Sequence, residues 1–326
     1  MLTTEYKTDI VSSPAITVIC PVFNEEKHIE RVLEFFTRAL PANKELIVVD
    51  AGSTDQTLSI FRNWESKHRG IRLLHNPRRH VSFALNDAIK KAKGEIIVRI
   101  DAHSDYADDY FEKILAAFEK TGADIVGGPT RTAYSDPMQE AVAYAICTRF
   151  AIGNSRVHLH DYEGFTDSVT FGSWKKNIFN VTGLFDERLK RNQDDEFHYR
   201  AKSFGFSIYQ SPDIKLYYYP RNSLKGLYRQ YYEYGLYKPM VLKKVNSGLQ
   251  WRHLVPSLFV VYLFTLFLAI AYPFWLLPLA LYLFVNVLFM LRSRKTIAVM
   301  CRLFFVYMTI HVGYGLGFLS GLRKII

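Results

Sequence analysis

Two polar side chains follow an apolar run with the spacing of a metal site. Residues 95–101 read EIIVRID, and one alanine separates Asp101 from His103. Side chains two positions apart in an extended segment project from the same side, so these two could hold one divalent cation. A carboxylate suits Mg²⁺ or Mn²⁺, the imidazole favours Mn²⁺, and either ion would neutralise a leaving nucleoside diphosphate. The alternative is a solvated strand end that binds nothing.

An acidic cluster at residues 192–196, NQDDE, offers carboxylates for proton transfer. One of them could take the proton from an acceptor hydroxyl as a general base, with Arg200 as its charge partner. The structural alternative is a helix N-terminus, where the helix dipole favours acidic side chains. The residues alone leave both interpretations open.

Aromatic residues mark two further candidate binding regions. Residues 228–234 read YRQYYEY among several cations, and Arg229 and Tyr232 could hold a leaving diphosphate or a lipid-linked pyrophosphate. The same composition is typical of a basic, aromatic belt at a cytoplasmic membrane surface. Trp174 follows two small residues and could stack on a sugar ring, although a buried core position is the alternative.

The domain that must position these residues alternates strands and helices. Apolar and amphipathic runs predict strands at 15–20, 45–50, 71–74, 95–101 and 123–127, and helices at 26–40, 81–92 and 109–120. Ser53 and Gln56 predict a capping box for a further helix after the second strand. This order predicts the α/β class, with a mostly parallel sheet and helices on both faces. Ligands bind at the carboxyl ends of such strands, where Asp50 and Asp101 lie.

The loop after the first strand lacks the motifs of two common nucleotide-binding sites. Residues 21–26 read PVFNEE and contain neither GxGxxG nor GxxxxGK[ST]. This sequence disfavours a dinucleotide dehydrogenase and a P-loop ATPase. A nucleotide bound here needs another way to hold its diphosphate, and a metal ion is the simplest one.

The last part of the chain is almost purely apolar. Three runs, 254–272, 273–291 and 297–319, each approach the ~20 residues that cross a bilayer. We therefore predict a soluble domain at 1–220, basic aromatic juxtamembrane helices at 221–253 and a transmembrane helical region at 254–326. A buried helical core is the alternative.

Three glycines in the last apolar run recur every four residues. Gly313, Gly317 and Gly321 fall on one helical stripe, where glycine lets another helix approach closely. The expected partner is one of the first two apolar segments or a second copy of the chain, so a homo-oligomer is one expectation. Phe318 is expected to face lipid.

Charge and cysteine content narrow the partners and the compartment. The net charge of +10 fits nucleic acid, an anionic membrane surface or phosphorylated substrates. Much of the excess adjoins the apolar segments and no nucleic-acid module is recognisable, so we expect membrane lipid and no nucleic acid. Cys20, Cys147 and Cys301 are odd in number and widely separated, which fits a reducing compartment.

Five motifs in order resemble family 2 glycosyltransferases. They are PVFNEE at 21–26, VVDAGSTD at 48–55, RIDAH at 99–103 in the place of DxD, VTGLFDE at 181–187, and Asp194 at the aspartate of the ED motif. Within the family the chain looks most like the succinoglycan-type enzymes of bacterial exopolysaccharide assembly. Those share the DAH variant, the Gly-[Ser/Ala]-Trp stretch, the NQDDE stretch and a hydrophobic C-terminal part.

This resemblance implies a GT-A fold for the 1–220 domain, inversion at the anomeric carbon, a nucleoside-diphosphate sugar donor and Mn²⁺ or Mg²⁺. A UDP-sugar is the expected donor. Matching residue by residue, the donor would contact Pro21, Asn24, Glu25, Asp50 at the base, Arg79 at the diphosphate, and Asp101.

The resemblance also implies roles around the reacting atoms. Asp101 would hold ribose or metal, His103 would face the metal, and Asp194 would be the general base. Asp195 and Trp174 are expected on the acceptor side. His103 replaces the second acid of DxD, and Gln193 replaces the first acid of the ED pair.

The expected protein is a multi-pass enzyme of the inner membrane with a cytoplasmic catalytic domain. It would add a single sugar to a polyprenyl-diphosphate-linked saccharide, because residues 229–232 resemble only loosely the QxxRW motif of processive synthases. One alternative is an enzyme that charges polyprenyl phosphate itself. A remote alternative is a basic membrane scaffold without catalysis.

Overall fold

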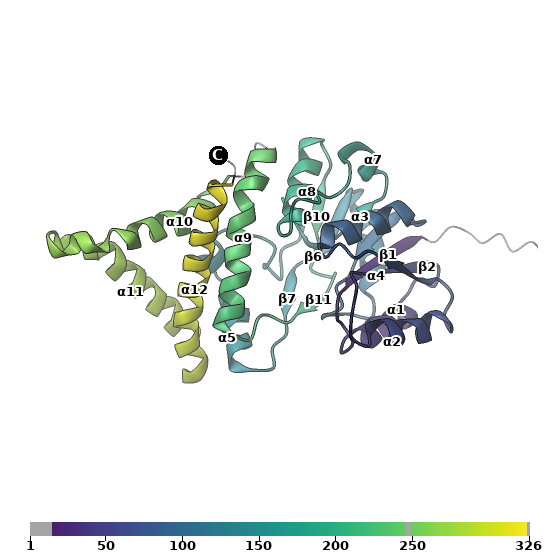
Figure 1. Ribbon diagram of the computed structural model, residues 1–326, viewed down its shortest axis with the longest axis horizontal. Coiled ribbons are helices and arrows are strands. Elements are labelled where there is room, and N and C mark those ends of the chain that lie inside the picture. Colours follow the sequence, from purple (N-terminus) through teal and green to yellow (C-terminus); the bar gives the residue numbers. More distant parts are fainter. Residues whose placement is uncertain (1–14, 246–248, 325–326) are drawn as a thin grey trace, which may run out of the picture.

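An eight-stranded mixed sheet forms the centre of the protein, in the order β3-β2-β1-β4-β9-β6-β10-β8 (Figure 1). The computed structural model describes residues 15–245 and 249–324. The strands of this sheet are β1 (Ile16–Val22), β2 (Lys44–Asp50), β3 (Ile71–His75), β4 (Ile96–Arg99), β6 (Ile125–Gly128), β8 (Gly164–Phe165), β9 (Thr170–Lys175) and β10 (Ile208–Gln210). A second sheet of three strands, β5 (Ser104–Tyr106), β11 (Leu216–Tyr218) and β7 (Thr130–Thr132), lies beside it.

Within the described residues, β8 and β9 run against the other strands of the main sheet. β1 pairs in parallel with β2 and β4, and β2 pairs in parallel with β3. β9 then runs antiparallel to both β4 and β6. The prediction of a mostly parallel sheet is right for β1, β2, β3, β4, β6 and β10, and wrong for β8 and β9, which make the sheet mixed. It omits β9 because Gly172 and Lys175 belong to residue types that are depleted in strands.

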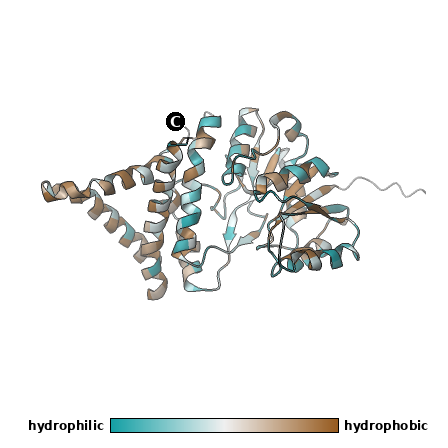
Figure 2. Cartoon of the chain, in the orientation of Figure 1, coloured by the Kyte–Doolittle hydropathy of each residue, from teal (hydrophilic) through white to brown (hydrophobic). Residues whose placement is uncertain are grey.

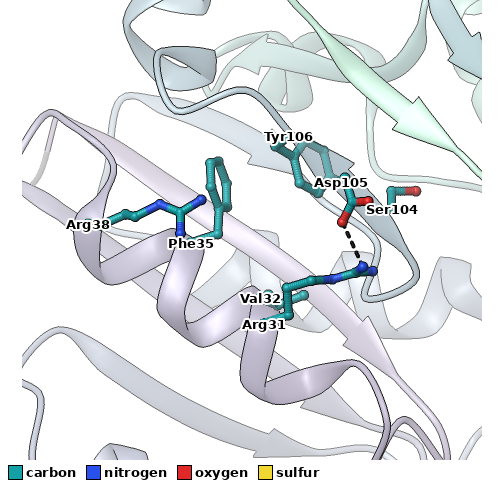
Figure 3. A pocket seen from close by; sticks show the side chains of 7 residues that line it. All are labelled: Arg31, Val32, Phe35, Arg38, Ser104, Asp105 and Tyr106. Carbon is teal, nitrogen blue, oxygen red and sulfur yellow. Dashed lines mark ion pairs between the residues drawn. The ribbon is translucent and has the colours of Figure 1, made fainter. Parts of the chain in front are cut away.

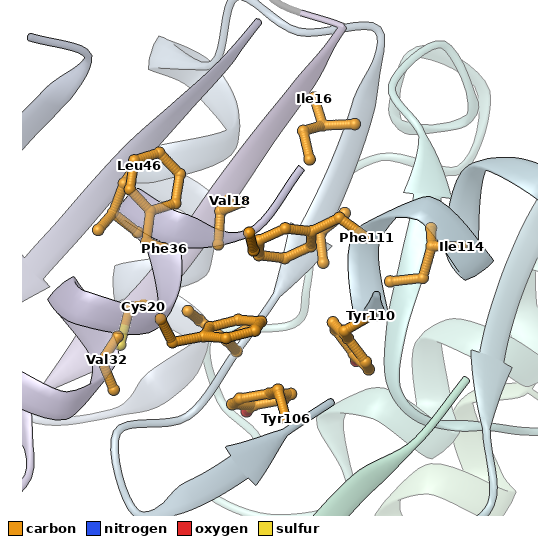
Figure 4. Close-up of a cluster of buried hydrophobic side chains, with 14 of the residues drawn as sticks. Ile16, Val18, Cys20, Val32, Phe36, Leu46, Tyr106, Tyr110, Phe111 and Ile114 are labelled. Carbon is orange, nitrogen blue, oxygen red and sulfur yellow. The ribbon is translucent and has the colours of Figure 1, made fainter. Parts of the chain in front are cut away.

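Helices cover both faces of the sheet, as predicted. One face packs against α1 (Ile29–Arg38), α2 (Thr57–Glu65) and α4 (Tyr110–Thr121), and the other against α3 (Val81–Lys91), α7 (Ile178–Thr182) and α8 (Gln193–Ser203). In β1, Ile16 and Val18 join Phe36 and Phe111 on the first face, which Figure 4 shows, while Ile19 joins the second. Burial on both faces explains why every residue of the strand except Thr17 is apolar.

The predicted capping box is wrong. Gln56 is the residue before α2, but its side chain makes no capping hydrogen bond, and Asp55 Oδ1 accepts from the backbone N–H of Thr57 at 3.0 Å. Instead the backbone N–H of Asn24 donates to Ser53 Oγ, and the backbone N–H of Gln56 donates to Glu26. These residues join two loops to each other. For the same reason α1 begins at Ile29, later than the predicted residue 26.

The C-terminal part is a group of helices beside the sheet domain. It contains α9 (Leu224–Val245), α10 (Trp251–Phe264), the short 3-10 helices η1 (Leu266–Ile270) and η2 (Pro273–Leu276), α11 (Leu277–Arg292) and α12 (Ile297–Leu322). Figure 1 shows α9 and α12 side by side, with α10 and α11 meeting at a tip far from the sheet. That tip is hydrophobic in Figure 2 and exposes Phe264, Ile270 and Phe274.

Two stretches are long and apolar enough to cross a membrane. Pro273–Arg292 is largely exposed, and Ile297–Leu322 is partly buried inside the protein. The first predicted segment, 254–272, is not one helix, because α10 ends at Phe264 and η1 follows. Length and composition thus give weak support to a membrane region, and they do not support three equal crossings.

The α12 helix is tied to the sheet domain by a third core. That core joins Val142 and Ile146, in and just after α5 (Pro137–Ala145), to Leu303, Val306 and Tyr307 of α12. The glycine stripe of α12 is a packing face, as predicted, but Gly313, Gly317 and Gly321 face α9. The predicted partner, a first or second apolar segment or a second copy, is therefore wrong. Phe318 is buried, so the expectation that it faces lipid is also wrong.

Candidate functional site

The loops that follow β1 and β2 interlock at one edge of the sheet. Val22 pairs with Asp50 at the carboxyl ends of the two strands. Asn24, whose φ of 55° is left-handed, accepts a hydrogen bond from the Thr54 backbone N–H at 2.8 Å. The backbone N–H of Glu25 donates to Thr57 Oγ1 at 2.8 Å. The two motifs, PVFNEE and VVDAGSTD, therefore form one structural unit.

Asp50 is fully buried within this unit. Its carboxylate accepts hydrogen bonds from the backbone N–H groups of Gly52 and Ser53, at 3.0 and 3.1 Å, and lies 3.3 Å from His75 Nδ1. These contacts shape the loop. That Asp50 accepts a hydrogen bond from a nucleobase stays a prediction.

Pro21 and Arg79 border the same loop. Pro21 is half-buried, and the Arg79 guanidinium stacks 4.7 Å from the centre of the Phe23 ring. Arg79 is thus brought to the PVFNEE loop, where the sequence places the donor.

A buried arginine joins the two carboxylates that carry the predicted chemistry. Arg99 Nε and Nη2 contact the Asp101 oxygens at 3.0 and 3.2 Å, and Arg99 Nη1 contacts Asp194 Oδ2 at 2.8 Å. Its side chain is 7% exposed and lies against the Phe171 ring. Burial disfavours the charged guanidinium, but Asp101 and Asp194 together raise the pKa of Arg99 above its ordinary value. The site is therefore an ionic triad.

Sequence reasoning misses Arg99 as a functional residue. The available signal is a single cation within the apolar strand β4, two positions before Asp101. That spacing puts both side chains on one side of the strand. The link from Arg99 to Asp194 has no local signal, because α8 reaches the strand only through tertiary packing.

His103 and Asp101 have separate partners in this structure. His103 Nδ1 lies 3.5 Å from Glu25 Oε1, and this contact raises the pKa of His103 despite partial burial. The backbone N–H of Asp101 donates to Tyr106 Oη at 2.7 Å. Glu25, expected at the nucleoside, thus lies beside the expected metal ligand.

The residues fit an ion that substrate completes. Within residues 15–245 and 249–324, no three His, Cys, Asp or Glu side chains form a metal-binding group. Mg²⁺ is commonly held by one or two carboxylates together with waters and substrate phosphates. Arg99 leaves carboxylate lone pairs of Asp101 free, since a carboxylate has about four acceptor sites. Asp101 and His103 would therefore need a bound diphosphate to complete the shell of an ion, and their role as metal ligands stays a prediction.

The first turn of α8 carries Asp194, Asp195 and Glu196, so the acids do lie at a helix N-terminus. Asp194 faces Arg99, as described above. Asp195 Oδ2 lies 2.7 Å from Lys238 Nζ, while Glu196 pairs with Arg200 at 2.7 Å. Arg200, the predicted charge partner of the acidic cluster, thus pairs with Glu196, whereas Asp194 pairs with Arg99.

The order of motifs and the fold together decide the family. The sequence model of Glycosyl transferase family 2 matches residues 17–184, more than half of the chain. The chain belongs to glycosyltransferase family 2. It is 31% identical over 231 residues to the succinoglycan biosynthesis protein ExoA of Rhizobium meliloti, covering 70% of each chain.

Other relatives extend over nearly the whole length of this glycosyltransferase. A Methanococcus voltae dolichyl N-acetyl-alpha-D-glucosaminyl phosphate 3-beta-D-2,3-diacetamido-2,3-dideoxy-beta-D-glucuronosyltransferase is 27% identical, over 94% of this chain and 98% of its own. The structure of the mannosyltransferase PcManGT from Pyrobaculum calidifontis with GDP-Man and Mn²⁺ has a TM-score of 0.61 at 19% identity, covering 96% of this chain and 88% of that one. The likeness shows a shared GT-A-like α/β fold.

Trp174 is a core residue of this glycosyltransferase. It is fully buried in β9 and packs edge to face on Phe185 and Phe197, with ring centres 5.5 and 6.2 Å away. The prediction that Trp174 stacks on a sugar is wrong, and the alternative of a buried position is confirmed. Composition alone does not tell which residues surround Trp174, because a Gly-Ser-Trp sequence is compatible both with a tryptophan that faces the core and with one that faces a ligand.

Arg229 and Tyr232 lie on α9. The Arg229 side chain is 78% exposed and pairs loosely with Glu233 at 3.4 Å. Tyr232 stacks on Tyr228 with ring centres 6.0 Å apart. Their roles toward a diphosphate or a lipid head group stay predictions.

A small cavity lies apart from the ionic triad, between α1 and β5 (Figure 3). It encloses about 160 Å³, and the ion pair of Arg31 with Asp105, at 2.8 Å, lies at its edge. Pockets for small-molecule ligands usually enclose about 300–1,000 Å³, and neither Asp101 nor Asp194 lines this one. We therefore do not assign the donor to it.

Proposed function

We propose that this glycosyltransferase moves a single sugar from a nucleoside-diphosphate sugar to a lipid-linked saccharide, with inversion and with Asp194 as the general base. The observation that carries the proposal is the Arg99 triad, which holds Asp194 beside the strand end that carries Asp101. Two relatives point to the substrate class. One is named for succinoglycan biosynthesis, and the other for transfer to a dolichyl-phosphate-linked N-acetylglucosamine.

In the proposed step Asp194 accepts the proton of the acceptor hydroxyl as its oxygen forms a bond to the anomeric carbon. The bond from that carbon to the diphosphate oxygen breaks, and the nucleoside diphosphate leaves with the electron pair. Asp101 and His103 would hold Mn²⁺ or Mg²⁺, which when bound neutralises the leaving diphosphate. Arg99 keeps the Asp194 carboxylate oriented until the proton arrives.

A donor screen tests the first half of the proposal. Purified full-length protein in detergent is heated with UDP- or GDP-sugars in the presence of Mn²⁺, because a bound donor stabilises the fold by mass action. We expect a UDP-sugar to raise the melting temperature in wild type and much less in Asp101→Asn. Equal stabilisation of both proteins, or none by any nucleotide sugar, would contradict the donor site.

The acceptor is tested by offering two lipids with the donor that the screen identifies. We expect release of nucleoside diphosphate with a polyprenyl-diphosphate saccharide and little release with bare polyprenyl phosphate. The reverse preference would favour the alternative function, charging of the lipid phosphate itself.

We also propose that the sheet domain lies in the cytoplasm and that α10 with η1 leads the chain into the inner membrane, from which α11 returns it. Arg292, Arg294 and Lys295 lie at the junction of α11 and α12, after this return, and cations favour the cytoplasmic side. A cysteine at Arg294, which is exposed, is a better probe than one at Ser293, which is buried. Labelling of that cysteine by an impermeant reagent in intact cells would contradict this topology.

A further inference from the structure

The segment that carries the proposed base is held by α9 through three polar contacts. Arg191 Nε lies 2.8 Å from Glu233 Oε2, and Asn192 Nδ2 donates to the Tyr234 carbonyl oxygen at 2.8 Å. One turn along α9, Lys238 contacts Asp195, as described above. Asp194 lies between the second and third of these contacts.

Two features make these contacts more than a surface network. The Lys238 side chain is 7% exposed and that of Glu233 is 13% exposed, so both charges are largely removed from water. Asn192 has a left-handed φ of 61° and directly precedes α8. Asn192, which precedes Asp194, thus adopts a backbone conformation that is uncommon for residues other than glycine. The Tyr234 carbonyl oxygen of α9 accepts the hydrogen bond from its side-chain amide.

The other face of α9 touches α12 backbone to backbone. A Cβ built on Gly317 would lie 2.1 Å from the Tyr232 carbonyl oxygen, and one on Gly235 would lie 2.2 Å from the Tyr314 carbonyl oxygen. A Cβ on Gly321 would lie 2.4 Å from the Leu236 carbonyl oxygen. Neither helix can move toward the other, and a Cβ at any of these three positions would force the two backbones apart.

We propose that α9 positions the base and that α12 holds α9 in register, so that the last helix takes part in catalysis and is not only an anchor. The proposal rests on Asp194 as the base of the proposed function. Lys238 and Glu233 are positioning residues, because they act on Asp194 through its neighbours. Any partner that shifts α12, a lipid surface included, would then change the rate of transfer.

The first test uses Gly317→Ala in the full-length protein. Alanine favours helix more than glycine does, so a loss cannot come from helix propensity. We expect amide hydrogen exchange in residues 191–196 to rise about tenfold by local opening, while β1 amides stay protected. Phe305→Leu, at an exposed position of α12, is the control and should leave amide exchange unchanged both in residues 191–196 and in β1. Unchanged exchange in residues 191–196 of Gly317→Ala would overturn the proposal.

The second test uses Lys238→Met, which keeps the length of the side chain and removes its charge. With the donor from the screen, we expect kcat to fall about tenfold with the donor KM unchanged, and Lys238→Arg to recover most of it. Lys225→Met, an exposed lysine at the start of the same helix, is the control. Equal kcat in Lys238→Met and wild type would overturn the proposal.

The two tests separate this proposal from the proposed function. If Asp194 is not the base, Gly317→Ala still exposes residues 191–196 to exchange, while Asp194→Asn remains active. If α9 does not position the base, Asp194→Asn is inactive, while Lys238→Met and Gly317→Ala both behave as wild type.

Discussion

Asp194 and Asp195 are adjacent in sequence but belong to two regions of the molecule. Asp194 faces Arg99, on a strand that is paired on both sides, with β1 and β9. Asp195 faces Lys238, on a helix whose position depends on its packing against α12. The proposed base is therefore held from one side by a sheet and from the other by a helix pair.

The two cations are buried to the same degree, yet they serve different ends. Arg99 bridges two carboxylates and lies where the reaction is expected, whereas Lys238 holds a neighbour of the base. Burial by itself raises the pKa of Asp195, but Lys238 brings that pKa below its ordinary value. Removing one partner of a buried pair commonly costs about 3–5 kcal/mol, because it leaves an unpaired charge. We expect substitutions of Arg99 to change both kcat and the donor KM, and substitutions of Lys238 to change kcat alone.

Chelation should have the largest effect on the rate of transfer. It should act at Asp101 and His103 and leave the contacts between α9 and α8 unchanged. We expect excess chelator to abolish transfer, and Mn²⁺ to restore it at least as well as Mg²⁺, because imidazole prefers the softer ion. His103→Asp should shift the preference toward Mg²⁺. Hydrogen exchange in residues 191–196 should not respond to the chelator. Full activity in excess chelator would remove the metal from the mechanism.

The second largest effect should separate the two aspartates. Asp194→Asn should lower kcat by about 10²-fold or more, the usual loss for a positioned base, and leave donor stabilisation nearly intact. Asp195→Asn should lower kcat by less, since it disturbs only the positioning. Retained activity in Asp194→Asn together with an inactive Asp195→Asn would move the base to Asp195.

Arg99 provides a third and smaller effect. Arg99→Met should lower kcat about tenfold and raise the donor KM, because it releases both Asp194 and Asp101. Arg99→Lys should recover little, since a lysine is a point charge and cannot bridge two carboxylates with a planar fork. The steady-state parameters of both variants with the identified donor check this. Recovery in Arg99→Lys would mean that charge alone matters at this position.

The sequence predicts the local part of this site and misses its long-range part. The strand that ends at Asp50 and the helices around it follow from apolar periodicity and are confirmed, while β4 ends at Arg99, two residues before the predicted end at Asp101. The partners of Asp194 and Asp195 do not follow from apolar periodicity, because they depend on how α8 packs against β4 and α9. Trp174 shows the same limit, since its burial is decided by the unpredicted strand β9.

The glycine stripe of α12 illustrates a further limit. Its spacing correctly predicts a close helix contact, because it depends only on helix geometry. The spacing does not identify the partner helix, because any helix with a matching face could pack there. The α9 helix carries many charges, so a search for apolar segments does not predict it as the partner. A polar helix can still pack closely where Gly235 brings its backbone to the surface.

The smallest effect should come from the exposed side of α9. Arg229 is largely solvated and Glu233 keeps its stronger contact with Arg191, so Arg229→Ala should leave kcat unchanged. A cation near an anionic membrane surface contributes about 1 kcal/mol, so the KM for a lipid-linked acceptor in anionic vesicles should rise about fivefold. Arg229→Lys, which keeps the charge, should restore that KM. An unchanged KM in Arg229→Ala would leave Arg229 without a role toward lipid. A fall in kcat instead would mean that the exposed face of α9 also positions the base, and the contrast between the two faces of this helix would disappear.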